Sequence, residues 1–279
     1  MSTKRPAVAI VVSDLHCGCQ YGLCPPRIRL DGGGVYRQSE AQRHIWRHWL
    51  YFWREMVPAW VKGQPFVLAV NGDAVDGRHH GSTTQWSQNL ADQSHCAREV
   101  LETAQRAAPW ERLYWVRGTE AHAGPAGESE EELAESMGAV TDKHGNASRM
   151  ELWLRLGTGL AHITHTIAVT GSPAYETTAL CREYVDAAGE SAKWHLPPPD
   201  WVVRSHRHRS AEIRVPTKQG RATVLVTPGW QLRTPWVFRS SGGRALLPQI
   251  GGCALVAGEH ELYSRSYIHA LERSAPEVA

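Results

Sequence analysis

Short apolar runs that end on polar residues recur along the first half of the chain. The run AVAIVV (Ala7–Val12) leads into Asp14 and His16, and PFVLAV (Pro65–Val70) leads into Asn71. A third run, ERLYWV, has the same kind of ending. Continuous apolar runs of this length are typical of strands that are buried on both faces.

Helical spacing of apolar residues predicts two helices between these strands, over 39–61 and 87–108. The apolar face of the first helix carries Ile45, Trp49, Phe52, Trp53 and Met56. We interpret this face as packed core rather than as a surface for stacking nucleotide bases. The alternation of strand and helix predicts an open α/β sheet, in which ligands bind at the carboxyl ends of the strands.

The second half of the chain is rich in strand patterns, with one helix expected over 175–188. The strand patterns are MELWLRL, LAHITHTIAVT, DWVVRSH, ATVLVTPG, CALVAG and HELYSRSYI. The acids in the first turn of GESEEELAESMGAV favour a helix N-terminus, and we expect a solvated surface helix there. We expect residues 1–279 to form a single α/β domain, because later histidines add to the polar strand ends of the first half.

Composition narrows the class of protein without naming a partner. A hydrophobic fraction of 42% in 279 residues excludes disordered and collagen-like classes, and a net charge of +2 provides no broad basic field for nucleic acid. No apolar segment approaches the roughly 18 residues of a membrane helix, so we expect no membrane partner. The six cysteines form no Cys-x-x-Cys pair, which favours reduced thiols and a cytoplasmic protein.

The polar strand ends bring carboxylates and imidazoles together. Residues two apart on an extended chain point the same way, so Asp14 and His16 are expected to share a pocket. The remaining polar strand ends are Asn71, Asp73, Asp76, Glu120, His122, His165, His206 and His208. Mixed aspartate and histidine ligands without thiolate suit manganese, iron, nickel or zinc.

The order of these motifs carries a resemblance to a known family. Asp-x-His, Gly-Asp-x-x-Asp, Gly-x-x-x-His, a lone His and His-x-His follow one another from Asp14 to His208, an order that resembles the calcineurin-like metallophosphoesterase superfamily. The resemblance implies a calcineurin-like sandwich of two mixed β-sheets flanked by α-helices. Near variants with GTEAH, RSHRH and a TPGWQLRTP-like tail are encoded by phages and prophages, which implies a phage origin and the cytoplasm of a host cell.

The resemblance also assigns two divalent metal ions and their ligands. It implies that Asp73 bridges both ions, and we expect manganese first, with iron, nickel and zinc as alternatives. Two ions about 3.5–4 Å apart activate a water molecule and clamp the phosphate oxygens during in-line attack. The ligands implied for the first ion are Asp14, His16 and His208, and those for the second are His165 and His206.

The third motif departs from the family, which usually has Gly-Asn-His-Asp/Glu there. In strict register Thr119 replaces the asparagine ligand and Glu120 replaces the histidine. Because a carboxylate binds a divalent cation better than a hydroxyl, we predict Glu120 as the substitute ligand. His122 is then the expected general acid or transition-state donor.

Asp76 and Arg78 complete the predicted catalytic residues. The family pattern Gly-Asp-x-x-Asp-x-Arg implies that they orient a ligand or bind the phosphate, and simple turn chemistry is an alternative. His162 is expected to face away from His165, because the two are out of phase on a strand. We expect His162 to be packed or solvated.

The predicted reaction is hydrolysis of a phosphate ester, and a phosphodiesterase or nuclease acting on nucleic acid or a nucleotide is preferred. A phosphomonoesterase or protein phosphatase fits the same residues, and a catalytically impaired structural relative is the alternative from another class. A metallo-β-lactamase-like hydrolase is excluded, because Arg209 and Ser210 stand where its Asp-His pair belongs. The sequence leaves the oligomeric state open.

Overall fold

Two β-sheets face each other between layers of helices. The computed structural model describes residues 7–79, 81–168, 173–218, 220–240 and 248–271. Within them, the first sheet has six strands in the order β13 (Leu262–Ala270), β12 (Gln249–Ala257), β1 (Val8–Val12), β4 (Phe66–Asn71), β5 (Arg112–Val116) and β6 (Ser148–Arg149). The second has five, in the order β10 (Ala211–Thr217), β11 (Gly220–Val226), β9 (Trp201–Arg204), β8 (Gly159–Ile163) and β7 (Leu152–Leu156).

Both sheets are mixed. In the first, β1, β4, β5 and β6 run parallel, whereas β12 is antiparallel to β1 and to β13. In the second, β9 is parallel to β8 and β11, and the outer strands β7 and β10 are antiparallel to their neighbours. The α/β sandwich of two mixed sheets flanked by helices, predicted from the sequence, is confirmed.

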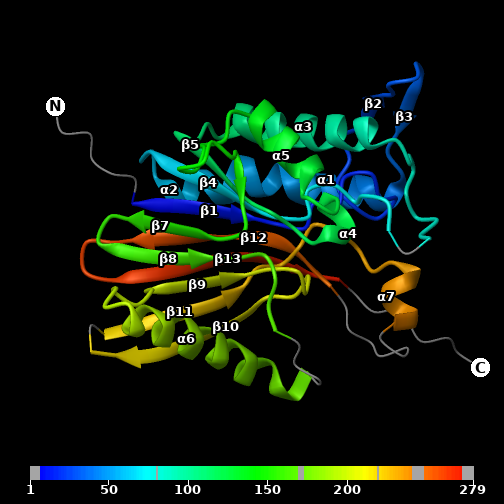
Figure 1. The fold of residues 1–279 in the computed structure, drawn as a ribbon. Coiled ribbons are helices and arrows are strands. Elements are labelled where there is room, and N and C mark those ends of the chain that lie inside the picture. Colours follow the sequence, from blue (N-terminus) through cyan, green and yellow to red (C-terminus); the bar gives the residue numbers. More distant parts are fainter. Residues whose placement is uncertain (1–6, 80, 169–172, 219, 241–247, 272–279) are drawn as a thin grey trace, which may run out of the picture.

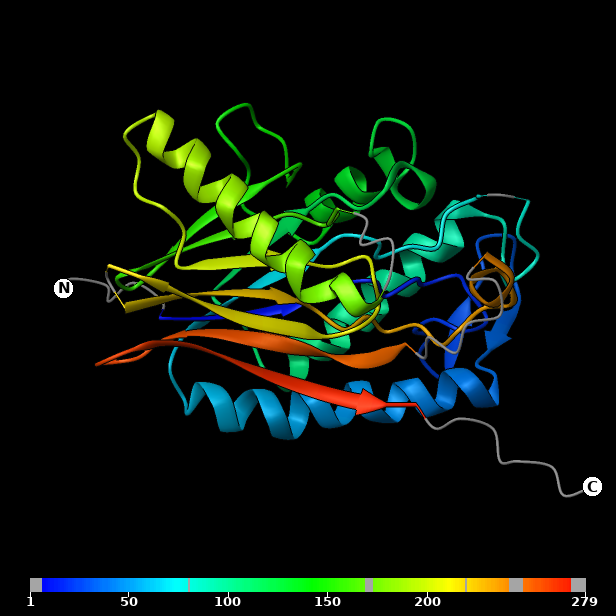
Figure 2. The ribbon, with the colours of Figure 1, turned by 90° about the horizontal axis from the view of Figure 1, so that it is seen from below.

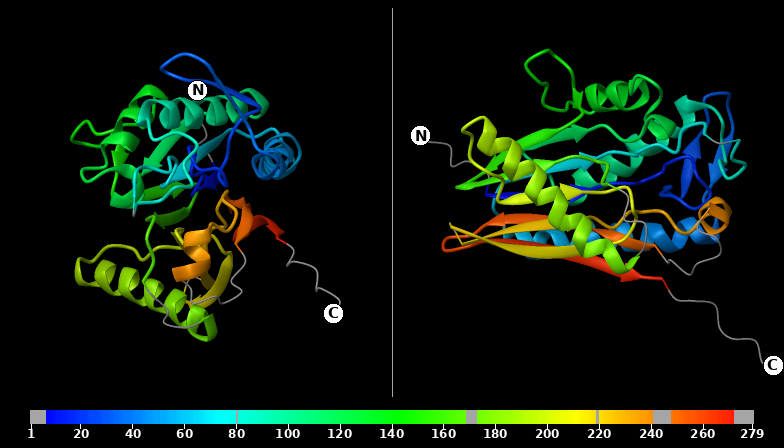
Figure 3. Two further views of the ribbon diagram at one scale, coloured as in Figure 1. Left: turned by 90° about the vertical axis from the view of Figure 1, so that its right-hand side faces the viewer. Right: turned by 60° about the horizontal axis from the view of Figure 1, so that its bottom comes forward.

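Helices cover the outer faces of the two sheets (Figures 1 and 3). The helices α1 (Glu40–Tyr51), α2 (Val57–Val61) and α3 (Leu90–Ala107) lie on the first sheet, together with the π-helix η1 (Phe52–Met56) between α1 and α2. The helix α6 (Glu176–Lys193) covers the second sheet, as the view from below also shows (Figure 2). The shorter elements are β2 (Arg27–Arg29), β3 (Val35–Arg37), α4 (Glu120–Ala123), α5 (Glu128–Ser136), η2 (Pro173–Tyr175) and α7 (Pro235–Ser240).

The unbroken apolar pattern of β1 follows from burial of this strand on both faces. Ala9 and Val11 lie in the core between the sheets, which also contains Trp201. Val8 and Ile10 lie in the core between the first sheet and the helices. Alternate residues of one strand therefore serve two different cores.

The aromatic face of the first helical segment is core, as predicted. Trp49 and Trp53 are buried, with their rings in T-shaped contact at 5.5 Å. Trp230, from the loop after β11, contacts Trp49 at 4.9 Å between ring centroids. Ser39 begins α1 with a capping box that includes Gln42, because its hydroxyl accepts from the backbone N–H of Gln42.

Several elements differ from the sequence prediction, among them α3, β10 and α5. Helix α3 begins at Leu90 rather than at 87, because the Asn89 side chain caps the N–H of Ala91. Strand β10 was missed, because charged residues alternate with apolar ones along it. The expectation of a solvated acidic helix at α5 is wrong for Glu130, which is fully buried. No helix among the described residues is long and apolar enough to cross a membrane.

Candidate metal centre

The predicted ligands converge where strands of both sheets end. Asp14 and His16 follow β1 and Asp73 follows β4 in the first sheet, and the other histidines, His165, His206 and His208, follow β8 and β9 of the second. Four groups of candidate ligand atoms lie there, each with all atoms within 4.8 Å of one another, and His122 belongs to two of them. The other two contain the predicted ligands of the two ions. One group is Asp14, His16 and His208, and the other is Asp14, Asp73, His165 and His206.

The backbone at these ligands is left-handed. Five of the seven described non-glycine residues with positive φ are Asp14, His16, Asp73, His206 and His208, with φ of 54°, 45°, 53°, 70° and 52°. Such conformations cost on the order of 1–3 kcal/mol each and persist only where the surroundings fix them. Here the loops after β1 and β4 fix each other, since Asp14 N–H donates to the Gly72 carbonyl at 2.9 Å and His16 N–H to the Asp73 carbonyl at 3.0 Å.

The first ligand group is arranged around Asp14. Nε2 of His208 lies 3.1 Å from Oδ1 of Asp14, and the Nε2 atoms of His208 and His16 are 3.2 Å apart. Nδ1 of His16 donates to Oδ1 of the buried Asp76 at 3.1 Å. Because this hydrogen bond occupies Nδ1, Nε2 is the nitrogen of His16 that can bind a metal. Carboxylates commonly orient metal-ligating histidines in this way.

The second ligand group is arranged around Asp73. Nε2 of His165 lies 3.0 Å from Oδ2 of Asp73, while Nδ1 donates to the Asn71 carbonyl at 2.6 Å. His206 is nearly half exposed and its Nδ1 lies 3.9 Å from Oδ2 of Asp73. The Thr119 N–H donates to Oδ1 of Asp73 at 2.8 Å, and its hydroxyl lies 3.2 Å from the same oxygen.

The electrostatics of the site favour bound positive charge. Burial opposes ionisation of Asp14 and Asp73, yet His208 and His165 hold the pKa of Asp14 below its usual value, and His165 and His122 do the same for Asp73. Burial also opposes protonation of His165, but Asp73 and Asp14 raise its pKa to about 10. In the metal-free site the His165 ring therefore stays protonated near neutral pH, beside the ionised carboxylates of Asp14 and Asp73. Buried carboxylates and imidazoles of this kind fit divalent transition metals.

The third motif is split between the site and the surface. His122 is half-buried, and its Nδ1 donates to the Asp76 carbonyl at 2.6 Å. Its Nε2 lies 3.9 Å from Oδ2 of Asp73, and burial lowers the pKa of His122 to about 4. Glu120 is exposed at the start of α4 and belongs to neither ligand group. Thr119, rather than Glu120, is the residue that contacts Asp73.

Asp76 and Arg78 lie in different surroundings. Besides His16, the Asp76 carboxylate accepts from Gln85 at 2.7 Å and from Gln231 at 3.4 Å. Arg78 is exposed and its Nε donates to the carbonyl of Gln88. The sequence also makes His80, two residues after Arg78, a candidate residue beside the metal centre, and this residue lies outside those that the structure describes.

The sequence analysis did not predict the hydrogen bonds that join the loops and strand ends carrying the ligands. Glu130 accepts from the N–H of Ala74 at 2.8 Å and of Gly118 at 2.5 Å, and so joins the loops after β4 and β5. Burial and the nearby Asp73 raise the pKa of Glu130 to about 7. A buried chain of short hydrogen bonds also links four strand ends through Asn71, Ser205, Thr227 and Ser13.

No protein-family model and no curated protein matches the chain. Among solved structures, vacuolar protein sorting 29 from Cryptosporidium parvum matches 96% of this chain over 100% of its own, with 10% identity and a TM-score of 0.41. The NAD nucleotidase of Haemophilus influenzae matches 95% of this chain with 13% identity and a TM-score of 0.45. The sulfate thiohydrolase SoxB of Thermus thermophilus matches 97% with 12% identity and a TM-score of 0.41. This chain spans 50% and 57% of the latter two. At these TM-scores, a functional assignment depends on the side chains of the site.

Proposed function

We propose that this protein is a dinuclear-metal-dependent phosphoesterase. The observation that supports it best is the pair of ligand groups described above, which share the buried carboxylate of Asp14 and of which the second also contains Asp73. Asp14, His16 and His208 hold the first divalent ion. Asp73 would be shared with the second ion, which His165 and His206 would also hold. Manganese is the preferred metal, with iron, nickel and zinc as alternatives.

Bound divalent ions polarise phosphate oxygens and lower the pKa of a water molecule, which gives the centre its hydrolytic chemistry. The chain supplies orientation and proton transfer. Asp76 fixes the ring of His16 through the Nδ1 contact, and Thr119 orients the Asp73 carboxylate. Because Nδ1 of His122 donates to the Asp76 carbonyl and burial lowers the pKa of this ring to about 4, Nε2 carries a lone pair near neutral pH. Nε2 lies 3.9 Å from Oδ2 of Asp73, where it would have to take up a proton before passing one to the leaving oxygen.

The substrate is a phosphate ester, and a phosphodiester of a nucleic acid or nucleotide is preferred. Arg78 is exposed, and its hydrogen bond among the described residues runs from Nε to the Gln88 carbonyl. The other two guanidinium nitrogens are therefore the ones proposed to bind a phosphate. Arg207 and Arg209, which flank the last ligand, are paired with Glu176 at 3.8 Å and 2.8 Å. Arg78 is therefore the rim cation assigned to the substrate. A phage origin agrees with a nucleic-acid substrate.

The test is hydrolysis of bis-p-nitrophenyl phosphate beside p-nitrophenyl phosphate by metal-stripped protein reloaded with Mn²⁺, Ni²⁺, Zn²⁺ or Mg²⁺. Metal-dependent turnover that is lost in Asp73→Asn and kept in Asp186→Asn, an exposed carboxylate on α6, supports the proposal. Faster diester hydrolysis supports the phosphodiesterase, and faster monoester hydrolysis supports a phosphomonoesterase. Bound metal without turnover would instead identify a catalytically impaired structural relative.

A further inference from the structure

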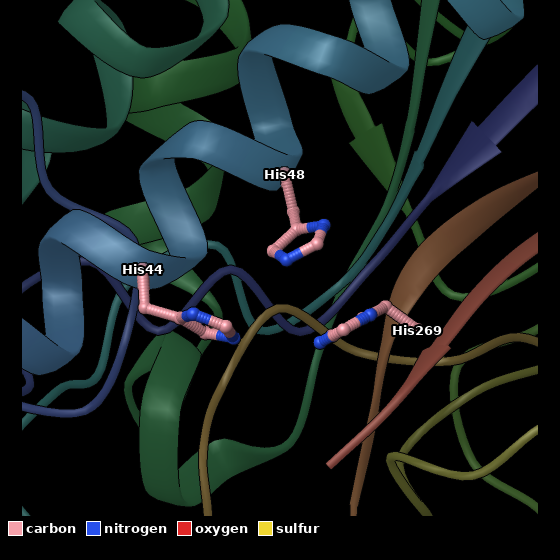
Figure 4. A group of neighbouring side chains, drawn as sticks. All are labelled: His44, His48 and His269. Carbon is pink, nitrogen blue, oxygen red and sulfur yellow. The ribbon is translucent and has the colours of Figure 1, made fainter.

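A second group of imidazoles lies outside the candidate metal centre. His44 and His48 are one turn apart on α1 and face His269 on the edge strand β13 (Figure 4). One ring nitrogen from each of the three lies within 4.8 Å of the other two. The ring centroids are 4.8 Å apart for His44 and His48, 5.4 Å for His44 and His269, and 3.9 Å for His48 and His269. The group shares no residue with the ligand groups described above.

The three rings are oriented for a common ligand. Figure 4 shows one nitrogen of each ring directed into the space that they enclose. Nδ1 of His48 lies 2.6 Å from the hydroxyl of Tyr267, which is also on β13. When Nδ1 donates to this hydroxyl, the lone pair of His48 is on Nε2. A hydrogen bond of this type to the other ring nitrogen is the usual outer partner of a metal-ligating histidine.

The surroundings keep two of these imidazoles in the form that binds metal. All three residues are half-buried. Burial, followed by the charge of His269, lowers the pKa of His44 and lowers that of His48 to about 4. Neutral imidazole is the ligand form of histidine, so these two rings need not lose a proton near pH 7 to bind a cation.

We infer that His44, His48 and His269 form a separate site for one borderline transition-metal ion, with Zn²⁺ as the expected occupant. Histidines at i and i+4 on a helix share one face, and this spacing is a known zinc-ligand arrangement. Three imidazoles leave the fourth tetrahedral position to water or an external ligand. A bound ion would join α1 to the edge strand of the first sheet. This site stands whether or not the proposed function holds.

The test counts zinc in chelator-stripped protein after equilibrium dialysis against Zn²⁺. His44→Ala and His269→Ala should each hold one zinc ion fewer per chain than wild type. His144→Ala, which removes an exposed histidine, should match wild type. Equal zinc content in His269→Ala and His144→Ala overturns the site and identifies the rings as a packed histidine stack. Far-ultraviolet circular dichroism confirms that each variant is folded.

A conservative pair of variants keeps the test valid if the alanine variants fail to fold. Tyr267→Phe removes only the hydroxyl beside His48, and it should weaken zinc binding by about tenfold or more. Tyr51→Phe, whose ring lies 5.7 Å from that of Tyr267, is the matched control and should bind as wild type does. Equal zinc affinity in the two variants contradicts the inference. Both are measured by calorimetry in an Asp14→Asn, Asp73→Asn background, which removes a carboxylate from each ligand group of the candidate metal centre, so that zinc there is not confused with zinc at this site.

Discussion

Replacing Gly72 by alanine tests how the loop after β4 positions His165. Gly72 has φ of +79°, and an added Cβ would lie 2.5 Å from Nδ1 of His165 and 2.6 Å from Cα of Gly118. Gly118 is itself packed tightly against Asp73, since a Cβ built at its position would lie 2.1 Å from Oδ1 of Asp73. Glu130 also binds the Gly118 N–H. The added methyl group should therefore displace His165 and break its bond to the Asn71 carbonyl.

The expected loss of unfolding free energy in Gly72→Ala has two parts, and a matched variant at another glycine separates them. Gly63 has φ of +72° with nothing within 4 Å of an added Cβ. Gly63→Ala should therefore show only the left-handed penalty, about 1–2 kcal/mol. Gly72→Ala adds an overpacking cost of about 1–3 kcal/mol. We expect Gly72→Ala to lower the free energy of unfolding by about 2–5 kcal/mol in total.

The assay is urea unfolding of both metal-free variants, followed by manganese titration of the folded proteins. Gly72→Ala should unfold at a lower urea concentration than Gly63→Ala and should bind manganese more weakly. If both variants unfold at the same urea concentration and bind manganese equally, the tight approach of Gly72 to His165 does not position the ligand, and the reasoning is refuted.

Three further perturbations have expected outcomes. Asp76→Ala should weaken manganese binding by about 10- to 100-fold through the loss of its contact with His16, and unchanged affinity in a titration would contradict that positioning role. Glu183→Ala should lower the free energy of unfolding, measured in urea, by about 3 kcal/mol, because the buried Arg204 guanidinium loses the carboxylate that lies 2.8 Å away. A change below about 0.5 kcal/mol would show that this ion pair does not stabilise the fold. Because the pKa of His165 is raised to about 10, the metal-free protein carries this proton at pH 8 and should release it as manganese binds. Calorimetry in buffers of different ionisation enthalpy measures that proton, and an enthalpy independent of buffer would exclude its release.

The sequence predicted which residues meet but not how they meet. Asp14 and His16 were expected to share a pocket because alternate residues of an extended strand point the same way. They do share a pocket, but each has positive φ in the loop beyond β1. The left-handed turns depend on hydrogen bonds to the loop after β4, which no local pattern reveals.

Long-range contacts account for the remaining differences. Glu130 was expected to be solvated because it lies in an acidic run, but two backbone N–H groups from distant loops donate hydrogen bonds to its carboxylate and compensate for its burial. Glu120 was chosen by comparing ligand strengths, whereas α4 begins at that residue and leaves it exposed. The pairing of His44 and His48 with His269 joins one of the first helices to the last strand, so only the i and i+4 spacing of its helical half is visible in the sequence, and no expectation was drawn from it.

The left-handed ligand residues affect how this site would change under mutation. At Asp14, Asp73 and His206, glycine or asparagine would relieve backbone strain, and at the two aspartates it would also remove a buried charge. Such variants should fold at least as stably as the natural chain while losing the ligands. A library sorted for abundance alone would therefore drift toward glycine and asparagine at these positions, whereas sorting for activity would restore aspartate and histidine.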